Sequence, residues 1–193
     1  MAPDPTHPSL EQIARWLTLP PEDLLRRCTQ APFQGPGPGG QKRNRVYSGV
    51  RLTHAESGLT AEASERREAR RNLEDALRRL RMSMALSLSP ALEEQASGAS
   101  ARSDTEVTQK AGQSSPSPLP FRAGANPAHA DFPIFAFAAL HALESRGGRL
   151  SEAAASLGAT ASALTRFLRS EKAVWARTQA IRKRNGIHPL KSG

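Results

Sequence analysis

The sequence predicts an α+β protein in which a small antiparallel sheet and a long helix are followed by a disordered linker and an all-α bundle. Residues 46–63 alternate apolar and polar side chains, which is typical of a β-hairpin. Residues 65–86 repeat apolar side chains at helical spacing. Residues 89–130 are rich in Ser, Ala, Gly and Pro and lack periodicity, so we expect a flexible linker there.

These patterns divide the chain into four segments. They are an N-terminal helical extension over 1–19, the α+β domain over 20–88, the linker over 89–130 and a helical domain over 131–193. In the first segment, Leu10, Ile13 and Leu17 share one helix face, and Ser9 is placed to cap that helix. A second short helix begins at Pro21, because proline fits the first helical position.

The α+β domain is predicted from three successive elements. A strand covers Val46 to Thr53, a turn containing Gly58 follows, and a second short strand covers 59–63. A long helix then runs from Glu65 to Leu86, with apolar residues along one stripe and arginines on its other faces.

Apolar periodicity returns at residue 131. Residues 132–145 predict a buried helix, and two further helices meet at a glycine turn around Gly158, which is the pattern of a helix-turn-helix. A final basic helix ends before Gly186. This unit is compatible with RNA or ribosome binding, with DNA binding, and with a purely structural or protein-binding role.

Composition limits the class of partner and site. The chain has 27 Lys and Arg against 18 Asp and Glu, a net charge of +9 and a pI near 10.9, which favours a polyanionic partner such as nucleic acid. Cys28 is the only cysteine and the five His are scattered, so we expect no disulfide, metal or other cofactor. No apolar run is long enough for a membrane span, and we expect a cytoplasmic, bacterial-type protein without membrane contact.

The stretch GPGPGGQKRN, residues 35–44, has three possible interpretations. It is too close to the predicted strand for an ordinary linker. It does not match a phosphate-binding loop, because no Ser or Thr follows Lys42, nor a dinucleotide fingerprint, because a strand rather than a helix comes next. The remaining interpretation is a thin loop that presents Gln41 to a site supplied by another molecule.

The segments GPGGQKRN and SGVRLTHAESGL, followed by the arginine-rich helix, resemble the catalytic domain of class I peptide chain release factors. The resemblance is greatest to the short, codon-independent ribosome-rescue members of that family, and it covers about residues 20–87. The positions that match the family pattern are Gly37 to Gln41, Asn44, Ser48, Val50 to Thr53, His54 and Gly58.

The resemblance implies a function and a set of site residues. Such proteins hydrolyse the ester between the nascent peptide and tRNA in the peptidyl-transferase centre, and the catalytic residues would be Gly39, Gly40 and Gln41. The partners would be the large ribosomal subunit, with its rRNA, and peptidyl-tRNA, and we expect a monomer. The residues expected to bind RNA are Lys42, Arg43, Asn44, Arg45, Arg51, Arg66, Arg67, Arg70, Arg71, Arg182, Lys183 and Arg184.

Two alternatives to this hydrolase remain open from the sequence. One is a non-catalytic accessory protein that binds rRNA or tRNA. The other is a DNA-binding regulator built on the helix-turn-helix, although DNA is the less favoured partner. The sequence also leaves open whether the target is an intact stalled ribosome or a split large subunit, and whether Gln41 is methylated.

Overall fold

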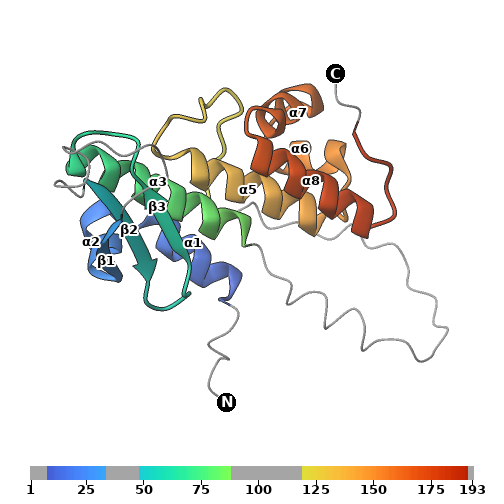
Figure 1. Cartoon of the computed structure of the whole chain (residues 1–193). Coiled ribbons are helices and arrows are strands. Elements are labelled where there is room, and N and C mark those ends of the chain that lie inside the picture. The colour runs from blue at the N-terminus through green and yellow to red at the C-terminus, as the bar shows by residue number, and fades with distance from the viewer. Residues whose placement is uncertain (1–7, 34–47, 88–118, 191–193) are drawn as a thin grey trace, which may run out of the picture.

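A computed structural model describes residues 8–33, 48–87 and 119–190 of the chain (Figure 1). The fold combines helices with a small antiparallel sheet, which confirms the predicted α+β class. None of the described helices has the length and apolar character that a membrane crossing requires. The elements are α1 (Leu10–Thr18), α2 (Pro21–Arg26), β1 (Cys28–Phe33), β2 (Gly49–His54), β3 (Thr60–Ala63), α3 (Ala69–Leu86), α5 (Phe132–Ser145), α6 (Leu150–Ser156), α7 (Ala161–Arg169) and α8 (Lys172–Arg184).

Helix α1 begins at a capping box. The Ser9 hydroxyl accepts a hydrogen bond from the Gln12 backbone N–H at 3.2 Å, and the Gln12 side chain accepts one from the Ser9 N–H at 2.8 Å. The predicted cap is therefore confirmed. Ile13, Trp16 and Leu17 on the inner face of α1 are buried, which ties this helix into the core.

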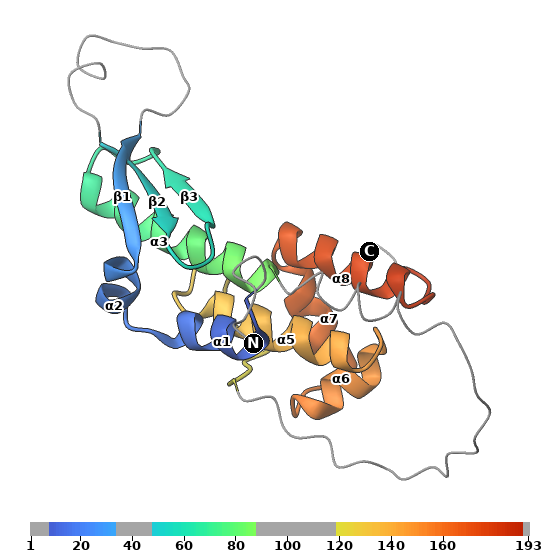
Figure 2. The same ribbon diagram turned by 90° about the horizontal axis from the view of Figure 1, so that it is seen from below.

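The sheet has three antiparallel strands in the order β1–β2–β3, as Figure 2 shows. The hairpin of β2 and β3 was predicted, whereas β1 was not. Its sequence, CTQAPF, lacks clear alternation and contains Pro32, which has no N–H to donate to a ladder. Such a residue is tolerated here because β1 is an edge strand, whose outward side has no partner.

Helix α3 packs against β2 and β3, and its buried side includes Ala76, Leu80 and Met84. It begins at Ala69, four residues later than predicted. The segment just before it is not helical, and there the Arg66 N–H donates to the Asn72 side-chain oxygen at 2.8 Å.

The C-terminal helices α6, α7 and α8 pack around α5, which is apolar on nearly all sides. Phe132, Leu140 and Leu143 of α5 are fully buried. Helices α6 and α7 meet at Gly158, whose φ of +65° agrees with the predicted glycine turn. The Thr160 hydroxyl caps α7 by accepting a hydrogen bond from the Ala163 N–H at 3.2 Å.

Residues 89–130 were predicted as a flexible linker, and the structure describes only the end of this segment. Residues 89–118 of that linker lie outside the described residues, but residues 119–130 pack against the helices. Leu119 is buried, and the ring of Phe121 meets Phe167 edge-on at 5.1 Å. Low hydropathy predicted a free coil, yet these two apolar side chains reach a partner surface that only the folded bundle provides.

The same core continues from the sheet domain into the bundle. Helix α5 contacts both α3 and α1, and Figures 1 and 2 show α5 beside these helices. Two arginines of α3 reinforce the contact region by donating to backbone carbonyls, Arg78 to Pro127 at 3.3 Å and Arg81 to Leu19 at 2.6 Å. The helical unit is therefore held in one orientation relative to the sheet.

Two histidines, the fully buried His54 and the half-buried His141, predict that acid destabilises this fold. Burial lowers the pKa of His54 and of His141 below the ordinary value of 6.5. Since the unfolded chain binds these protons more readily, the free energy of unfolding should fall as the pH drops below about 6.5, until the folded-state pKa values are reached. Thermal melts between pH 7.5 and 5 measure this. In His54→Asn the decline should be shallower than in the wild type, and an identical decline in the two proteins would contradict the prediction.

Candidate functional site

The Gly-Gly-Gln motif connects the paired ends of two strands. Phe33, the last residue of β1, is the register partner of Gly49, the first residue of β2. The connection between them, residues 34–47, is called the GGQ segment below. It contains the predicted catalytic residues and four of the predicted RNA-binding residues, all outside the described part of the chain: Gly39, Gly40, Gln41, Lys42, Arg43, Asn44 and Arg45.

The base of the GGQ segment is closely packed. A Cβ on Gly49 would lie 2.0 Å from the Phe33 carbonyl oxygen and 3.0 Å from the Cβ of Ser64. The contact with the Phe33 backbone is closer than real Cβ atoms approach, and the contact with Ser64 is tight, so the close approach of β1 and β2 here requires glycine at position 49. The end of the β1–β2 pair is thus a fixed platform from which the GGQ segment leaves and to which it returns.

A buried asparagine holds this platform to α3. The Asn72 side-chain nitrogen donates to the carbonyl oxygens of Ser48 at 2.7 Å and Arg66 at 2.8 Å, and its oxygen accepts from the Arg66 N–H at 2.8 Å. Asn72 is fully buried, and the hydroxyl of Ser48 donates to the Arg66 carbonyl at 3.2 Å. One side chain therefore fixes both the residue that follows the GGQ segment and the turn before α3.

The outer face of the sheet places one predicted RNA-binding residue beside the platform. The Arg51 guanidinium pairs with Glu62 on β3, with 2.6 Å between Nε and Oε1, and lies over the Phe33 ring at 5.1 Å. Its side chain is nearly half exposed. The aromatic ring and the carboxylate hold the cation in a defined place on the surface.

The predicted arginines at the start of α3 are mostly paired with carboxylates. Arg66 pairs with Asp75 at 3.4 Å, Arg70 with Glu74 at 3.4 Å, and Arg71 with Glu68 at 3.0 Å. Arg67 is exposed. Exposed ion pairs of this kind contribute only about 0–1 kcal/mol each, so these arginines can exchange a carboxylate for a phosphate at little cost.

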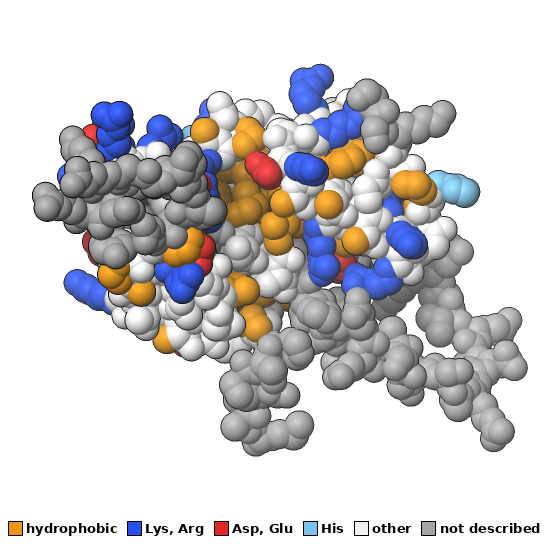
Figure 3. All heavy atoms as spheres, viewed as in Figure 1, with side chains coloured by type: hydrophobic (Ala, Val, Ile, Leu, Met, Phe, Trp, Pro, Cys, Tyr) orange, Lys and Arg blue, Asp and Glu red, His pale blue; other side chains and the backbone are white. Residues whose placement is uncertain are grey.

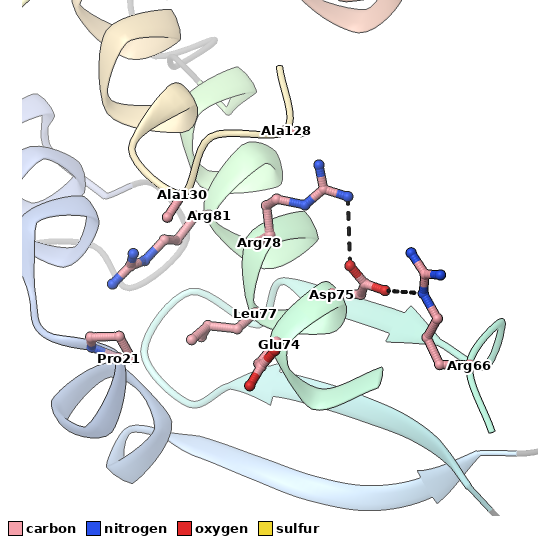
Figure 4. Close-up of a pocket in the computed structure, with 9 residues that line it drawn as sticks. All are labelled: Pro21, Arg66, Glu74, Asp75, Leu77, Arg78, Arg81, Ala128 and Ala130. Atoms are coloured by element: carbon pink, nitrogen blue, oxygen red, sulfur yellow. Dashed lines mark hydrogen bonds and ion pairs between the residues drawn. The ribbon is translucent and has the colours of Figure 1, made fainter. Parts of the chain in front are cut away.

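A hollow of about 490 Å³ lies beside these arginines, between α3, α2 and the segment before α5 (Figure 4). Asp75 bridges two guanidinium groups at its rim, Arg66 at 3.4 Å and Arg78 at 3.7 Å. Arg81 lines another part of the hollow, and burial lowers its pKa. Because the carboxylates of Asp75 and Glu74 line the hollow together with its arginines, they offset most of the positive charge, and we read the hollow as a contact region between segments rather than a strong anion site.

The predicted cations of α8 differ in their availability. Arg182 donates to the carbonyl oxygens of Gly148 at 2.7 Å and His188 at 2.8 and 3.0 Å, and so ties the chain after α8 to the turn before α6. Arg184 forms an ion pair with the mostly buried Glu144 of α5. Lys183 is exposed. The structure therefore gives Arg182 and Arg184 internal roles that a count of charges did not suggest.

His54, which matches the family pattern, lies on the core side of the sheet. It is fully buried, its Nδ1 is 2.9 Å from the Ser57 hydroxyl, and its ring meets Trp16 of α1 edge-on at 4.6 Å between centroids. This packing is a structural role. Within the described ranges, no cluster of three or more His, Cys, Asp or Glu side chains is arranged to hold a metal ion.

Sequence reasoning missed two residues of the platform, Asn72 and Gly49. A signal for Asn72 was present, because it precedes buried Ala76 by four residues and so falls on the inner stripe of α3. A polar residue on that stripe indicates a buried hydrogen-bond partner. Gly49 gave no comparable signal, since its need for glycine comes from β1, which was not predicted.

Comparison with known proteins agrees with this geometry. The model of the RF-1 domain matches residues 16–117, which is more than half of the chain. Peptide chain release factor 1 of Dictyoglomus turgidum is 35% identical over 74 residues, covering 38% of this chain and 18% of the relative. Peptide chain release factor 1 of Amoebophilus asiaticus is 43% identical over 49 residues, covering 25% of this chain and 14% of the relative.

The chain thus aligns with less than a fifth of the length of each of these relatives. No solved structure matches it significantly. The family match spans α2, the whole sheet and α3, and it includes the GGQ segment and the Asn72 platform. The chain therefore belongs to the release-factor family defined by the RF-1 domain.

Proposed function

We propose that this protein hydrolyses the ester bond of peptidyl-tRNA in the peptidyl-transferase centre of the ribosome, without reading a codon. The observation that carries the proposal is the position of Gly39, Gly40 and Gln41 in an RF-1 domain, between strand ends that Asn72 holds to α3. A motif that must enter a narrow RNA site needs a thin tip and a firm base, and the chain supplies glycines for the first and the platform for the second.

The chemistry assigned to Gln41 depends on its backbone. As water attacks the ester carbonyl, negative charge develops on the carbonyl oxygen, and the Gln41 N–H would donate to it. Glycines at 39 and 40 widen the backbone angles available for that orientation. The Gln41 amide would place the attacking water and exclude larger nucleophiles, but it does not titrate and so does not act as a general base.

The cations around the platform would bind rRNA and tRNA phosphates. Lys42, Arg43 and Arg45 follow the motif in sequence, and Arg51 lies on the outer sheet face beside Phe33. On α3 and just before it, the exposed ends of Arg66, Arg67, Arg70 and Arg71 supply further positive charge. Asn44 would add a neutral contact. The partners on this proposal are the large ribosomal subunit and peptidyl-tRNA, in the cytoplasm.

Codon independence is supported by the helical bundle that comes after the RF-1 domain in the chain. From residue 119 onward the described chain leads into α5–α8, which pack on α1 and α3. The aligned parts of the release-factor relatives are confined to less than a fifth of their length. A release domain joined to this bundle suits the rescue of stalled ribosomes better than the recognition of a stop codon.

The test is peptide release from purified ribosomes that carry radiolabelled peptidyl-tRNA. Three complexes are compared: mRNA truncated in the A site, a sense codon there, and a stop codon there. We expect release that does not require the stop codon. Puromycin confirms that each peptidyl-tRNA is reactive, and incubation without protein gives the spontaneous rate. Strict dependence on the stop codon would refute the rescue assignment, and a rate equal to the spontaneous one on all complexes, including split large subunits, would refute the hydrolase.

A further inference from the structure

We propose that the exposed face of α7 and α8 is a second RNA-binding surface, which recognises the phosphate backbone. This α7–α8 face is defined by Arg166, Arg169 and Lys172, none of which is buried. These residues are distinct from the arginines of α3. The proposal deepens the proposed function, since it rests on a ribosomal RNA target for the protein.

Charge is the first observation behind the α7–α8 face. Residues 161–190 contain seven Lys and Arg side chains and one acidic residue, Glu171, in a chain whose net charge is +9. Most of the positive excess of the molecule therefore lies in these two helices. By contrast, the arginines of α3 are interleaved with Asp75, Glu68 and Glu74, which pair with them.

The arrangement of these cations is the second observation. Arg166 and Arg169 lie on the side of α7 away from the buried Leu164 and Leu168, and Lys172 begins α8 just beyond. Across the described ranges, neither Arg166 nor Lys172 forms an ion pair with a carboxylate. Figure 3 shows Lys and Arg side chains over the part of the surface that α7 and α8 form.

Arg169 is held in place by an aromatic ring. Its guanidinium lies over Trp175 of α8, 5.2 Å from the ring centroid, so the cation bridges the two helices. A guanidinium fixed in this way loses less conformational freedom when it binds a phosphate. The Trp175 ring is itself partly exposed, so an apolar surface lies next to the Arg169 guanidinium.

The geometry favours backbone contacts over base reading in DNA. A helix-turn-helix reads bases with the N-terminal residues of its second helix. In α7 that end exposes only the small side chain of Ser162, whereas Arg166 and Arg169 lie in its last turn. Cations in the last turn of α7 can contact phosphates. Phosphate contacts position a protein on a nucleic acid but do not recognise its base sequence.

The α7–α8 face also has a fixed position relative to the catalytic platform. Both views place α7 and α8 at the end of the molecule away from β1 and β2, and α5 joins them to α3 and α1. RNA contacts on this face would therefore orient the GGQ segment as well as add affinity.

The test uses the full chain and the double variant Arg166→Gln/Lys172→Gln. The matched control is Arg15→Gln/Arg26→Gln, which removes the same charge from α1 and α2. Binding to a fluorescein-labelled RNA hairpin and to a DNA duplex of the same sequence is measured by anisotropy over a range of salt. We expect the double variant to lose about tenfold in RNA affinity near physiological salt, and the log–log salt slope to decrease by about 1–2. The control should change either quantity by less than half as much.

Peptide release from stalled ribosomes is the second readout. The concentration of double variant needed for half-maximal release should rise about tenfold, in line with the lost RNA affinity. Equal RNA affinity for the double variant and its control, or preference for the DNA duplex, would overturn the inference. If the wild type binds RNA through Arg166 and Lys172 but never releases peptide, the α7–α8 face stands and the proposed hydrolase fails.

Discussion

Replacement of Gly40 by alanine is expected to lower the rate of peptide release by about two to three orders of magnitude. On the proposed mechanism, a Cβ at position 40 would restrict the backbone angles that aim the Gln41 N–H, and loss of one such donor costs about 10²–10³ in rate. The Gln41→Ala variant would retain that N–H but lose the amide that places the attacking water, so we expect its rate to fall as well. Both should keep ribosome affinity, because neither removes a charge. The measurement is single-turnover release on saturated stalled ribosomes, together with a pelleting assay for binding.

A matched control comes from Gly124, which lies in the segment before α5. A Cβ there meets nothing within 4 Å, so Gly124→Ala should release peptide at the wild-type rate. If Gly40→Ala and Gln41→Ala matched this control in rate, the catalytic assignment of the GGQ segment would be wrong. If they instead lost ribosome binding in parallel with release, the segment would be an anchor rather than a catalyst.

Replacement of Asn72 by leucine should destabilise the fold by about 3–5 kcal/mol. Leucine has a similar size but leaves the Ser48 carbonyl and the Arg66 N–H without their Asn72 partner, whereas the Arg66 carbonyl keeps the Ser48 hydroxyl. Each buried polar group left unpaired costs about 1–3 kcal/mol. Urea unfolding followed by circular dichroism measures the change. Asn126→Ala is the control, since its side chain accepts one local hydrogen bond, from the Ala128 N–H, and it should cost less than about 1 kcal/mol.

The role of Asn72 in positioning the GGQ segment needs a readout separate from stability. Release is therefore measured at a temperature where Asn72→Leu remains folded, with ribosomes in excess. We expect the maximal rate to fall while ribosome affinity changes little, because the loosened platform misplaces the motif without removing a cation. A maximal rate equal to that of wild type would limit Asn72 to stability. A loss of stability no greater than in Asn126→Ala would contradict the hydrogen-bond argument itself.

Local patterns in the sequence predicted much of this protein. The N-cap at Ser9, the hairpin of β2 and β3, and the glycine turn at Gly158 depend on side chains close together in the chain, so their signals survive without tertiary context. Membership of the release-factor family was predicted from the same kind of local signal, the Gly-Gly-Gln motif followed by a hairpin and an arginine-rich helix. The roles of Gly39, Gly40 and Gln41 stay predictions, because these residues lie outside the described part of the chain.

Tertiary structure decided the features that local patterns left open. Edge strand β1 forms because β2 offers it a partner, and its pairing is the reason that position 49 requires glycine. Residues 119–130 and α5 pack against surfaces that exist only once α1, α3 and α7 are assembled. The partners of Arg182 and Arg184 lie far away in sequence, at Gly148 and Glu144. Contacts between residues so far apart in sequence produce no periodic pattern in a single sequence, because they depend on the path of the whole chain.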